Sequence, residues 1–260
     1  GSVAADIAAL GGKPDCLGVI GNDQNSETLK KKLTEIGADI SGLITEVNHS
    51  TISKQRLIGL AQHLHQQQLI RMDYEPQESL TDEQYEEILQ IYHDKLTSAD
   101  IVCLQDYDKG LLSPSVCRKM IQSARKADKK VLVDPSLASD YSKYEGATVI
   151  TPNRTESSSA VGFDITDAQS ANKAAEALAQ KYKLDAVVIT LDKEGAYLRA
   201  KDINQMIPTR SRSVYDVTGA GDMVLATLSI TLAAGFDYKT AVQLSNVTGG
   251  IEVEKFGTVT

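Results

Sequence analysis

The sequence predicts an α/β fold, with a mostly parallel central sheet, helices on both faces and a small inserted antiparallel sheet. Three observations predict it. From about residue 80 onward, apolar runs rich in β-branched residues alternate with helical patterns, which is typical of parallel strands joined by helices. Polar residues directly follow four of these runs. Residues 43–75 instead contain strand-like segments with no helical pattern between them.

Composition sets the size and the class of the protein. The chain has 260 residues, 42% hydrophobic and 24% charged, which suffices for one large domain with a small appendage. The net charge is −8 and no long basic run occurs, so nucleic acid is not an expected partner. No apolar stretch reaches about 18 residues, so we expect no contact with a membrane. Three widely spaced cysteines without a CxxC pair indicate neither zinc nor disulfides, and fit a cytoplasmic protein.

The elements of the body can be followed in order after residue 80. Thr81 and Asp82 precede apolar residues at helical spacing up to Leu96, which predicts a capped helix. Ser113 and Pro114 are a cap and a first-turn residue, and predict the start of the next helix. The other expected elements are strands at 100–104, 130–134, 147–151 and 185–190, a helix at 166–182, a hairpin at 195–200 and 203–207, and apolar helices near 220–234 and 238–253.

Residues 43–75 form a separate unit in this interpretation. The segments "LITEV", "TISKQRLIGL" and "QQQLIRMDYE" alternate polar and apolar residues, as strands do. We therefore divide the chain into an α/β body, residues 1–42 and 76–260, and a β lid, residues 43–75. An inserted sheet with one polar face commonly covers a site or pairs with a second copy of itself. The expected assembly is a homodimer joined through the lid sheet.

Four polar clusters stand where the predicted strands end. They are "QDYDKG" at 105–110, "DPS" at 134–136, "TPNRTE" at 151–156 and "TLDKEG" at 190–195. In open α/β sheets, ligands bind at the carboxyl ends of the strands. Four clusters at corresponding positions predict a crevice for a polar ligand.

The segment "DVTGAGD", residues 216–222, precedes an apolar helix. Gly219 and Gly221 permit a tight turn at the helix start, where free N–H groups and the helix dipole favour an anion such as phosphate. Asp222 beside them could accept a proton from an attacking hydroxyl. The structural alternative is a glycine-rich turn capped by Asp216, with Asp222 merely favourable in the first helical turn.

Together, "DVTGAGD" and the upstream "TPNRTE" resemble the D-x-x-G-A-G-D and N-x-x-E signatures of the ribokinase-like (PfkB) sugar kinase family. The stretch "VIGNDQNSETLKKKLTEIGADISGL" resembles the strand, turn and helix that lead to the lid in that family. The resemblance implies a ribokinase-like three-layer sandwich with a β lid. It also implies an ATP-dependent phosphotransferase that acts on an alcohol group, with ATP and Mg²⁺ as cofactors.

Within the family, "QQQLIRMDYE", "DYDKG", "VLVDPS" and "KFGTVT" resemble kinase domains of bacterial ADP-heptose synthesis. These domains phosphorylate the anomeric hydroxyl of D-glycero-β-D-manno-heptose 7-phosphate, a precursor of lipopolysaccharide. Many are fused to an adenylyltransferase, so a fused or separate adenylyltransferase is an implied partner. Two alternatives stay open: another PfkB-type kinase for ribose, fructose or a hexose phosphate, and a non-catalytic sugar or nucleotide binder.

The resemblance also implies roles for matching residues. Asp222 would be the catalytic base, and the backbone of Gly219, Ala220 and Gly221 would form the anion hole. The other implied residues are Asn153, Arg154, Thr155, Glu156, Thr190, Gly195 and Asn246 for the nucleotide, Asn153 and Glu156 for Mg²⁺ through water, and Arg71, Asp73, Asp106 and Lys109 for the sugar.

Some of these residues have structural alternatives, and the sequence departs from the family pattern in places. Asn153 three residues before Glu156 is also a capping-box pattern, and Arg71 could simply pair with Asp73. The departures are Asp108 and Asp192 where the family usually has Gly, and Ser136 where it commonly has Lys. Ser2 falls at the Asn position of an early family run, or that run is missing. The lost Lys and the two added Asp reduce positive charge near a phosphorylated substrate and leave the exact sugar open.

Overall fold

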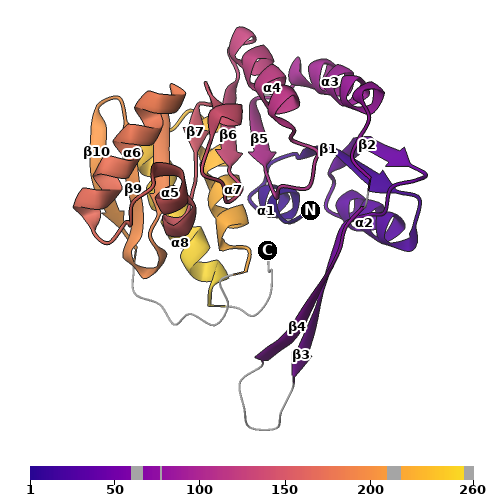
Figure 1. Cartoon of the computed structure of the whole chain (residues 1–260), viewed down its shortest axis with the longest axis horizontal. Helices are drawn as coiled ribbons and strands as arrows, with labels where there is room; N and C mark the ends of the chain where they lie inside the picture. Colours follow the sequence, from indigo (N-terminus) through magenta and orange to yellow (C-terminus); the bar gives the residue numbers. More distant parts are fainter. Residues whose placement is uncertain (60–66, 77, 210–217, 255–260) are drawn as a thin grey trace.

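The body is built on a six-stranded sheet in the order β10-β9-β8-β7-β6-β5 (Figure 1). The computed structural model describes residues 1–59, 67–76, 78–209 and 218–254. Strands β5 to β8 are parallel, and the last two strands are antiparallel. The bounds are β5 Ile101–Gln105, β6 Lys130–Asp134, β7 Val149–Ile150, β8 Ala186–Thr190, β9 Gly195–Ala200 and β10 Ile203–Pro208.

Helices cover both faces of this sheet. Val131 and Val133 pack into one hydrophobic core, and Leu132 between them packs into the other, as expected for a strand buried on both sides. The predicted α/β fold is therefore confirmed as a three-layer sandwich. One layer holds α3 Asp82–Leu96, α4 Pro114–Lys126, α5 Arg154–Val161 and α6 Ala168–Tyr182, and the other holds α1 Ser2–Ala9, α7 Ala220–Ala233 and α8 Tyr238–Glu252.

The helices begin where their capping residues stand. Thr81 Oγ1 accepts a hydrogen bond from Gln84 N, and α4 starts with Pro114 after the Ser113 cap, as predicted. The helix expected at 166–182 begins at Ala168, because the side chain of Asp167 caps it. Within the described ranges, no helix is long and apolar enough to cross a bilayer.

A second, smaller parallel sheet lies beside the six-stranded one. It pairs β1 (Asp15–Gly21) with β2 (Asp39–Glu46), which are connected by α2 (Gln24–Glu35). The prediction that residues 43–47 form an antiparallel lid strand is wrong, because Leu43 and Ile44 pair in parallel with Gly18 and Val19. The reason is burial: Ile44 is part of the body core.

The antiparallel insert is the hairpin of β3 (Ser53–Gly59) and β4 (Gln67–Tyr74), which projects away from the body (Figure 1). Cross-strand neighbours share a face, so the register separates two kinds of surface. One face carries Leu57, Ile70, Met72 and Tyr74, all of them exposed, and the other carries Lys54, Arg56, Arg71 and Asp73. The exact division of the chain into body and lid stays a prediction.

Candidate active site

The carboxyl ends of the parallel strands bring the predicted polar clusters together. Gln105 Nε2 donates to Asp134 Oδ2 at 2.7 Å, and Thr151 Oγ1 donates to Asp134 Oδ1 at 3.1 Å. Asn153 and Thr190 form a parallel bridge that extends the pairing of β7 and β8. Residues from four strand ends therefore meet at one edge of the sheet.

Helix α7 begins after a left-handed glycine. Gly219 precedes the helix with φ of 91°, a conformation that glycine adopts without strain. The first intrahelical hydrogen bond runs from Met223 N to Gly219 O. The N–H groups of Ala220, Gly221 and Asp222 precede this bond, and no residue in the described ranges accepts from them. The helix start therefore has the geometry of an anion site. Asp216, the alternative cap, lies outside the described residues.

Asp222 lies in the first turn of α7 and contacts a residue that the sequence analysis missed. Tyr107 Oη donates a hydrogen bond to Asp222 Oδ1 at 2.8 Å. Partial desolvation of the hydroxyl, followed by the charge of Asp222, raises the pKa of Tyr107 above its usual value, so the phenol remains a donor at neutral pH. Tyr107 belongs to the "QDYDKG" cluster, but no local pattern reveals a contact with a residue so distant in the sequence.

Asp134 is the second functional candidate that the sequence analysis did not single out. A Cβ at Gly221 would lie 3.6 Å from Asp134 Oδ2, which places this carboxyl group beside the start of α7. Burial raises the pKa of Asp134 to about 7, and the charges of Glu156 and Asp222 add to the shift. Asp134 begins the segment "DPS", which the sequence analysis placed at a strand end. Position at a strand end does not show which of its side chains faces the site.

Asn153 and Glu156 form the capping box of α5. Glu156 N donates to Asn153 Oδ1 at 2.9 Å, and Asn153 N donates to Glu156 Oε2 at 2.8 Å. Both residues therefore have the capping role that the sequence analysis gave as the alternative. The cap uses only one carboxylate oxygen of Glu156, and burial raises the pKa of this carboxyl group. A metal role for the second oxygen is compatible with the cap.

The surroundings of Asp134 and Glu156 fit a hard cation. Within the described residues, Gln105 Oε1 and Tyr141 Oη are buried without a hydrogen-bond partner. Burial, followed by the charges of Glu156 and Asp134, raises the pKa of Tyr141. Carboxylate and amide oxygens suit Mg²⁺, which also retains several waters. In the part of the chain that the structure describes, no three His, Cys, Asp or Glu side chains form a complete cage. A cation here would share its coordination with water or phosphate.

The guanidinium of Arg154 is used within the protein. It donates to Asp192 Oδ2 at 2.9 Å, to Glu194 Oε1 at 2.7 Å and to the Ile165 carbonyl at 2.8 Å. The bonds to Asp192 and Glu194 connect α5 to η2 (Asp192–Glu194), the short turn after β8. Thr155, its neighbour, is exposed. A nucleotide role for either residue stays a prediction.

Gly195 and Asn246 meet at one backbone carbonyl. Gly195 has φ of 109°, and any Cβ there would collide with the carbonyl oxygen of Ile207. Asn246 Nδ2 donates to the same oxygen at 2.8 Å. The structure thus brings these two predicted nucleotide residues together, although the amide of Asn246 already holds α8 against β10.

The residues predicted for the sugar lie in two different settings. Arg71 forms two hydrogen bonds of 2.9 Å with Asp73 on the exposed hairpin, and Lys109 Nζ lies 2.6 Å from Glu75 Oε1. Asp106 is buried, and its carboxylate accepts from Tyr144 Oη at 2.7 Å and pairs with Lys143 at 2.6 Å. The Asp106 carboxylate thus holds the loop after β5, and its contact with a substrate stays a prediction.

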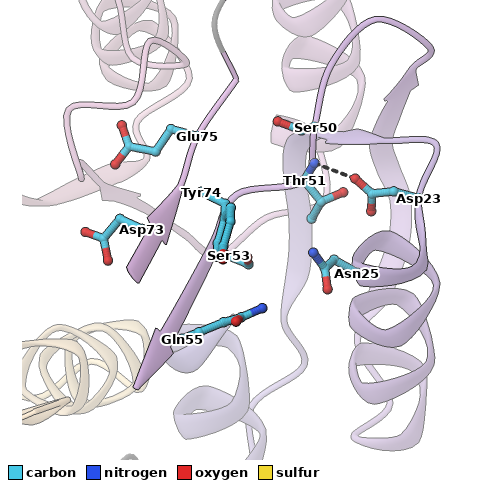
Figure 2. A pocket seen from close by; sticks show the side chains of 9 residues that line it. All are labelled: Asp23, Asn25, Ser50, Thr51, Ser53, Gln55, Asp73, Tyr74 and Glu75. Carbon is cyan, nitrogen blue, oxygen red and sulfur yellow. Dashed lines mark hydrogen bonds between the residues drawn. The ribbon is translucent and has the colours of Figure 1, made fainter. Parts of the chain in front are cut away.

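A polar cavity of about 600 Å³ lies between the base of the hairpin and the start of α2 (Figure 2). Asp23 caps α2 and also accepts a hydrogen bond from Thr51 N at 2.8 Å, which holds the entry to the hairpin against the body. The cavity is lined by Asp23, Asn25, Ser50, Thr51, Ser53, Gln55, Asp73, Tyr74 and Glu75.

Comparison with known proteins shows the family to which the chain belongs. The model of the pfkB family of carbohydrate kinases matches residues 2–260. The chain belongs to this family. Two curated relatives are named bifunctional protein HldE: that of Desulfatibacillum aliphaticivorans is 37% identical over 261 residues, and that of Trichlorobacter lovleyi is 39% identical over 261 residues. Each alignment covers 100% of this chain and 52% of the relative, so the chain spans about half of the relatives' length.

Solved structures share the fold of this pfkB family member. Phosphofructokinase-2 from Escherichia coli, solved with potassium, has a TM-score of 0.78 at 19% identity. The match covers 99% of this chain and 81% of the phosphofructokinase chain. Ribokinase from Arabidopsis thaliana, solved with ribose and ATP, has a TM-score of 0.75 at 20% identity. The match covers 98% of this chain and 80% of the ribokinase chain. The predicted ribokinase-like sandwich is confirmed by these neighbours.

Proposed function

We propose that this chain is an ATP-dependent sugar kinase with Asp222 as its general base. The observation that carries the proposal is the start of α7, where a carboxylate stands beside the N–H groups of Gly221 and Ala220, from which no described residue accepts a hydrogen bond. Such a helix start can stabilise the charge of a migrating phosphoryl group. The carboxylate can remove the proton of the attacking hydroxyl in the same geometry.

Asp134 and Glu156 would hold Mg²⁺ near the phosphates. A carboxylate beside an anion site repels phosphate unless it is protonated or a cation lies between them. The buried oxygen of Gln105, which has no hydrogen-bond partner among the described residues, and the raised pKa of Asp134 both support a cation in this place. When bound, the ion would neutralise charge on the transferring phosphate. Asp222 accepts the proton, and the N–H groups of α7 orient the anion.

The acceptor that we propose is D-glycero-β-D-manno-heptose 7-phosphate. The relatives are named bifunctional protein HldE, and the segments around Arg71 and Tyr107 resemble heptose kinase domains. The charged face of the hairpin supports a phosphorylated acceptor. Arg56 and Arg71 are direct cross-strand neighbours, and like charges in such pairs are unfavourable. Asp73 pairs with Arg71 and offsets part of this repulsion. A phosphate beside Arg56 would offset the rest, and would select sugar phosphates over free sugars.

The relatives' length suggests further features of the native protein. Because the chain spans about half of the HldE relatives, we propose that it acts with an adenylyltransferase, fused or separate. The exposed apolar face of the hairpin supports a homodimer joined through the lid, since an isolated two-stranded hairpin is only marginally stable in water. ATP and a sugar phosphate remain the expected small-molecule partners.

An ADP-release assay of the full-length protein tests the proposed function. The acceptors are heptose 7-phosphate, ribose, fructose and fructose 6-phosphate. We expect turnover with the heptose phosphate, and a loss of about 10²–10⁴-fold in kcat for Asp222→Asn without loss of ATP binding. Asp82→Asn is the matched control, since Asp82 is also an acid in the first turn of a helix.

Each outcome separates one alternative. Turnover only with ribose or fructose would support another member of the family instead. ATP binding without turnover of any acceptor would support a non-catalytic binder. Unchanged ADP release by Asp222→Asn would contradict the assignment of the base.

A further inference from the structure

Tyr107 connects two parts of the molecule that approach each other at the candidate site. Its hydroxyl lies 2.8 Å from Asp222 Oδ1. Its ring lies under the ammonium group of Lys54, with Nζ 4.9 Å from the ring centroid. Lys54 belongs to β3 of the hairpin, and Asp222 belongs to α7 of the body. One side chain therefore contacts both the hairpin and the proposed base.

The backbone on both sides of Tyr107 is fixed. Asp106 N donates to Asp134 O at 3.0 Å, and the buried carboxylate of Asp106 pairs with Lys143 at 2.6 Å. Asp108 N donates to Asp106 Oδ1 at 2.8 Å in a left-handed turn with φ of 57°. Because these bonds are buried or partly buried, the loop holds Tyr107 in one direction, toward α7.

A hydrogen bond to one oxygen defines the orientation of a carboxylate. Hydrogen bonds to ionised acceptors are short and comparatively strong. With Oδ1 held by Tyr107, the second oxygen of Asp222 is the one left for an incoming hydroxyl. A base that can rotate freely loses part of the benefit of a prearranged reacting geometry.

We propose that Tyr107 is a positioning residue that orients the Asp222 carboxylate, and that Lys54 makes this orientation depend on the placement of the hairpin. The proposal rests on the proposed kinase function. A cation over an exposed aromatic ring contributes modestly, so the effect of Lys54 should be smaller than that of the hydroxyl. The hairpin would then act on the base through Tyr107, as well as by covering the site.

The test uses the ADP-release assay with the full-length protein. It compares four variants: Tyr107→Phe, Lys54→Met, Asp222→Asn and the double variant Tyr107→Phe/Asp222→Asn. Tyr107→Phe keeps the ring under Lys54 and removes only the hydroxyl, so we expect kcat to fall about 10-fold or more, with KM for ATP and Tm unchanged. Lys54→Met should lower kcat a few-fold. The double variant Tyr107→Phe/Asp222→Asn should be no slower than Asp222→Asn alone, because residues that act as a unit are not additive.

Tyr85→Phe is the matched control. Its hydroxyl donates to the carbonyl of Gly110 at 2.8 Å, on the same loop as Tyr107, but not to Asp222. We expect Tyr85→Phe to keep the wild-type kcat. A comparable loss of kcat in both variants would indicate a loop effect, and would overturn the positioning role.

The remaining outcomes separate this proposal from the proposed function. If the wild type turns over and Asp222→Asn does not, full activity of Tyr107→Phe overturns the positioning role alone. If the wild type releases no ADP with any acceptor, the proposed function fails and the positioning role fails with it. A Tyr107→Phe variant that is slower even in the Asp222→Asn background would also contradict the proposal.

Discussion

Asp108 and Asp192 have φ of 57° and 53°, in the left-handed region that favours glycine. These are two of the positions where the family pattern usually carries glycine. Aspartate tolerates this conformation better than most residues, so the departures leave the turns intact. Asp192 also gains a partner in Arg154, at 2.9 Å. The backbone explains the glycine of the family, and the local hydrogen bonds explain how aspartate replaces it.

At the residue scale, the buried carboxyl group of Asp6 leads us to expect that the stability of the folded protein depends on pH. Burial raises its pKa to about 7, with the charges of Glu252 and Asp222 adding to the shift. A raised pKa means that the folded state favours the protonated acid. The stabilisation from Asp6 is thus complete below about pH 4 and is lost as the pH rises to about 7.

Asp6→Asn should remove this dependence. At ~1.4 kcal/mol per pKa unit, the upper bound of the gain in stability at pH 8 is about 4 kcal/mol, with little change at pH 4. Thermal unfolding of both proteins at pH 4, 6 and 8 measures it. Asp134, whose pKa is also raised, is common to both proteins, so the difference isolates Asp6. An equal gap in Tm at every pH would contradict the assignment.

At the scale of elements, α5 combines a cap with a proposed metal residue. The cap bonds of Asn153 and Glu156 lie at the carboxyl edge of the sheet, beside the bridge to Thr190. A helix whose cap fails would tilt or fray at its first turn. The same pair of residues can therefore affect activity indirectly, through the helix, or directly, through a cation.

Three substitutions separate the two effects. Asn153→Ser retains a capping side chain and should keep stability within about 0.5 kcal/mol, while Asn153→Ala should cost about 1 kcal/mol. Glu156→Gln retains an acceptor for Asn153 N and removes only the charge. We expect Glu156→Gln to keep Tm and to need at least about 10-fold more Mg²⁺ for half-maximal ADP release. Unchanged Mg²⁺ dependence would leave Glu156 as a cap alone.

At the scale of the whole molecule, the hairpin has an apolar face that the described residues leave exposed. Leu57 is 54% exposed and Ile70 53% exposed, and both lie on the face opposite to the charged one. Contiguous apolar surface on a soluble protein usually marks an interface. A second copy that covers this face would leave the charged face of each hairpin directed at its own site.

The molecular mass in analytical ultracentrifugation tests the proposed lid-to-lid dimer. We expect the wild type to sediment as a dimer, and Leu57→Lys/Ile70→Lys to sediment as a monomer with an unchanged circular dichroism spectrum. Arg56→Gln, on the opposite face, should leave the mass unchanged. A monomeric wild type at micromolar concentration in analytical ultracentrifugation would refute the lid-to-lid dimer.

Local patterns were sufficient for most elements but not for their pairing. The caps Thr81 and Ser113 start helices because the interaction spans only three residues. Strand β2 was assigned to the wrong sheet because its partner β1 lies more than 20 residues earlier and the pairing is decided by burial of Ile44. The "KFGTVT" segment, residues 255–260, lies outside the described residues.

The sequence by itself determined the α/β alternation, the glycine turn before α7, the family and the identity of Asp222 as the candidate base. Only the tertiary structure decided that Tyr107 and Asp134 face that site, that Arg154 bonds to Asp192, and that Asp106 is buried. The physical reason is range. Capping, turn conformation and hydrophobic periodicity act within a few residues, whereas the hydrogen bond from Tyr107 to Asp222 joins positions 115 residues apart and exists only after the sheet and its helices have packed.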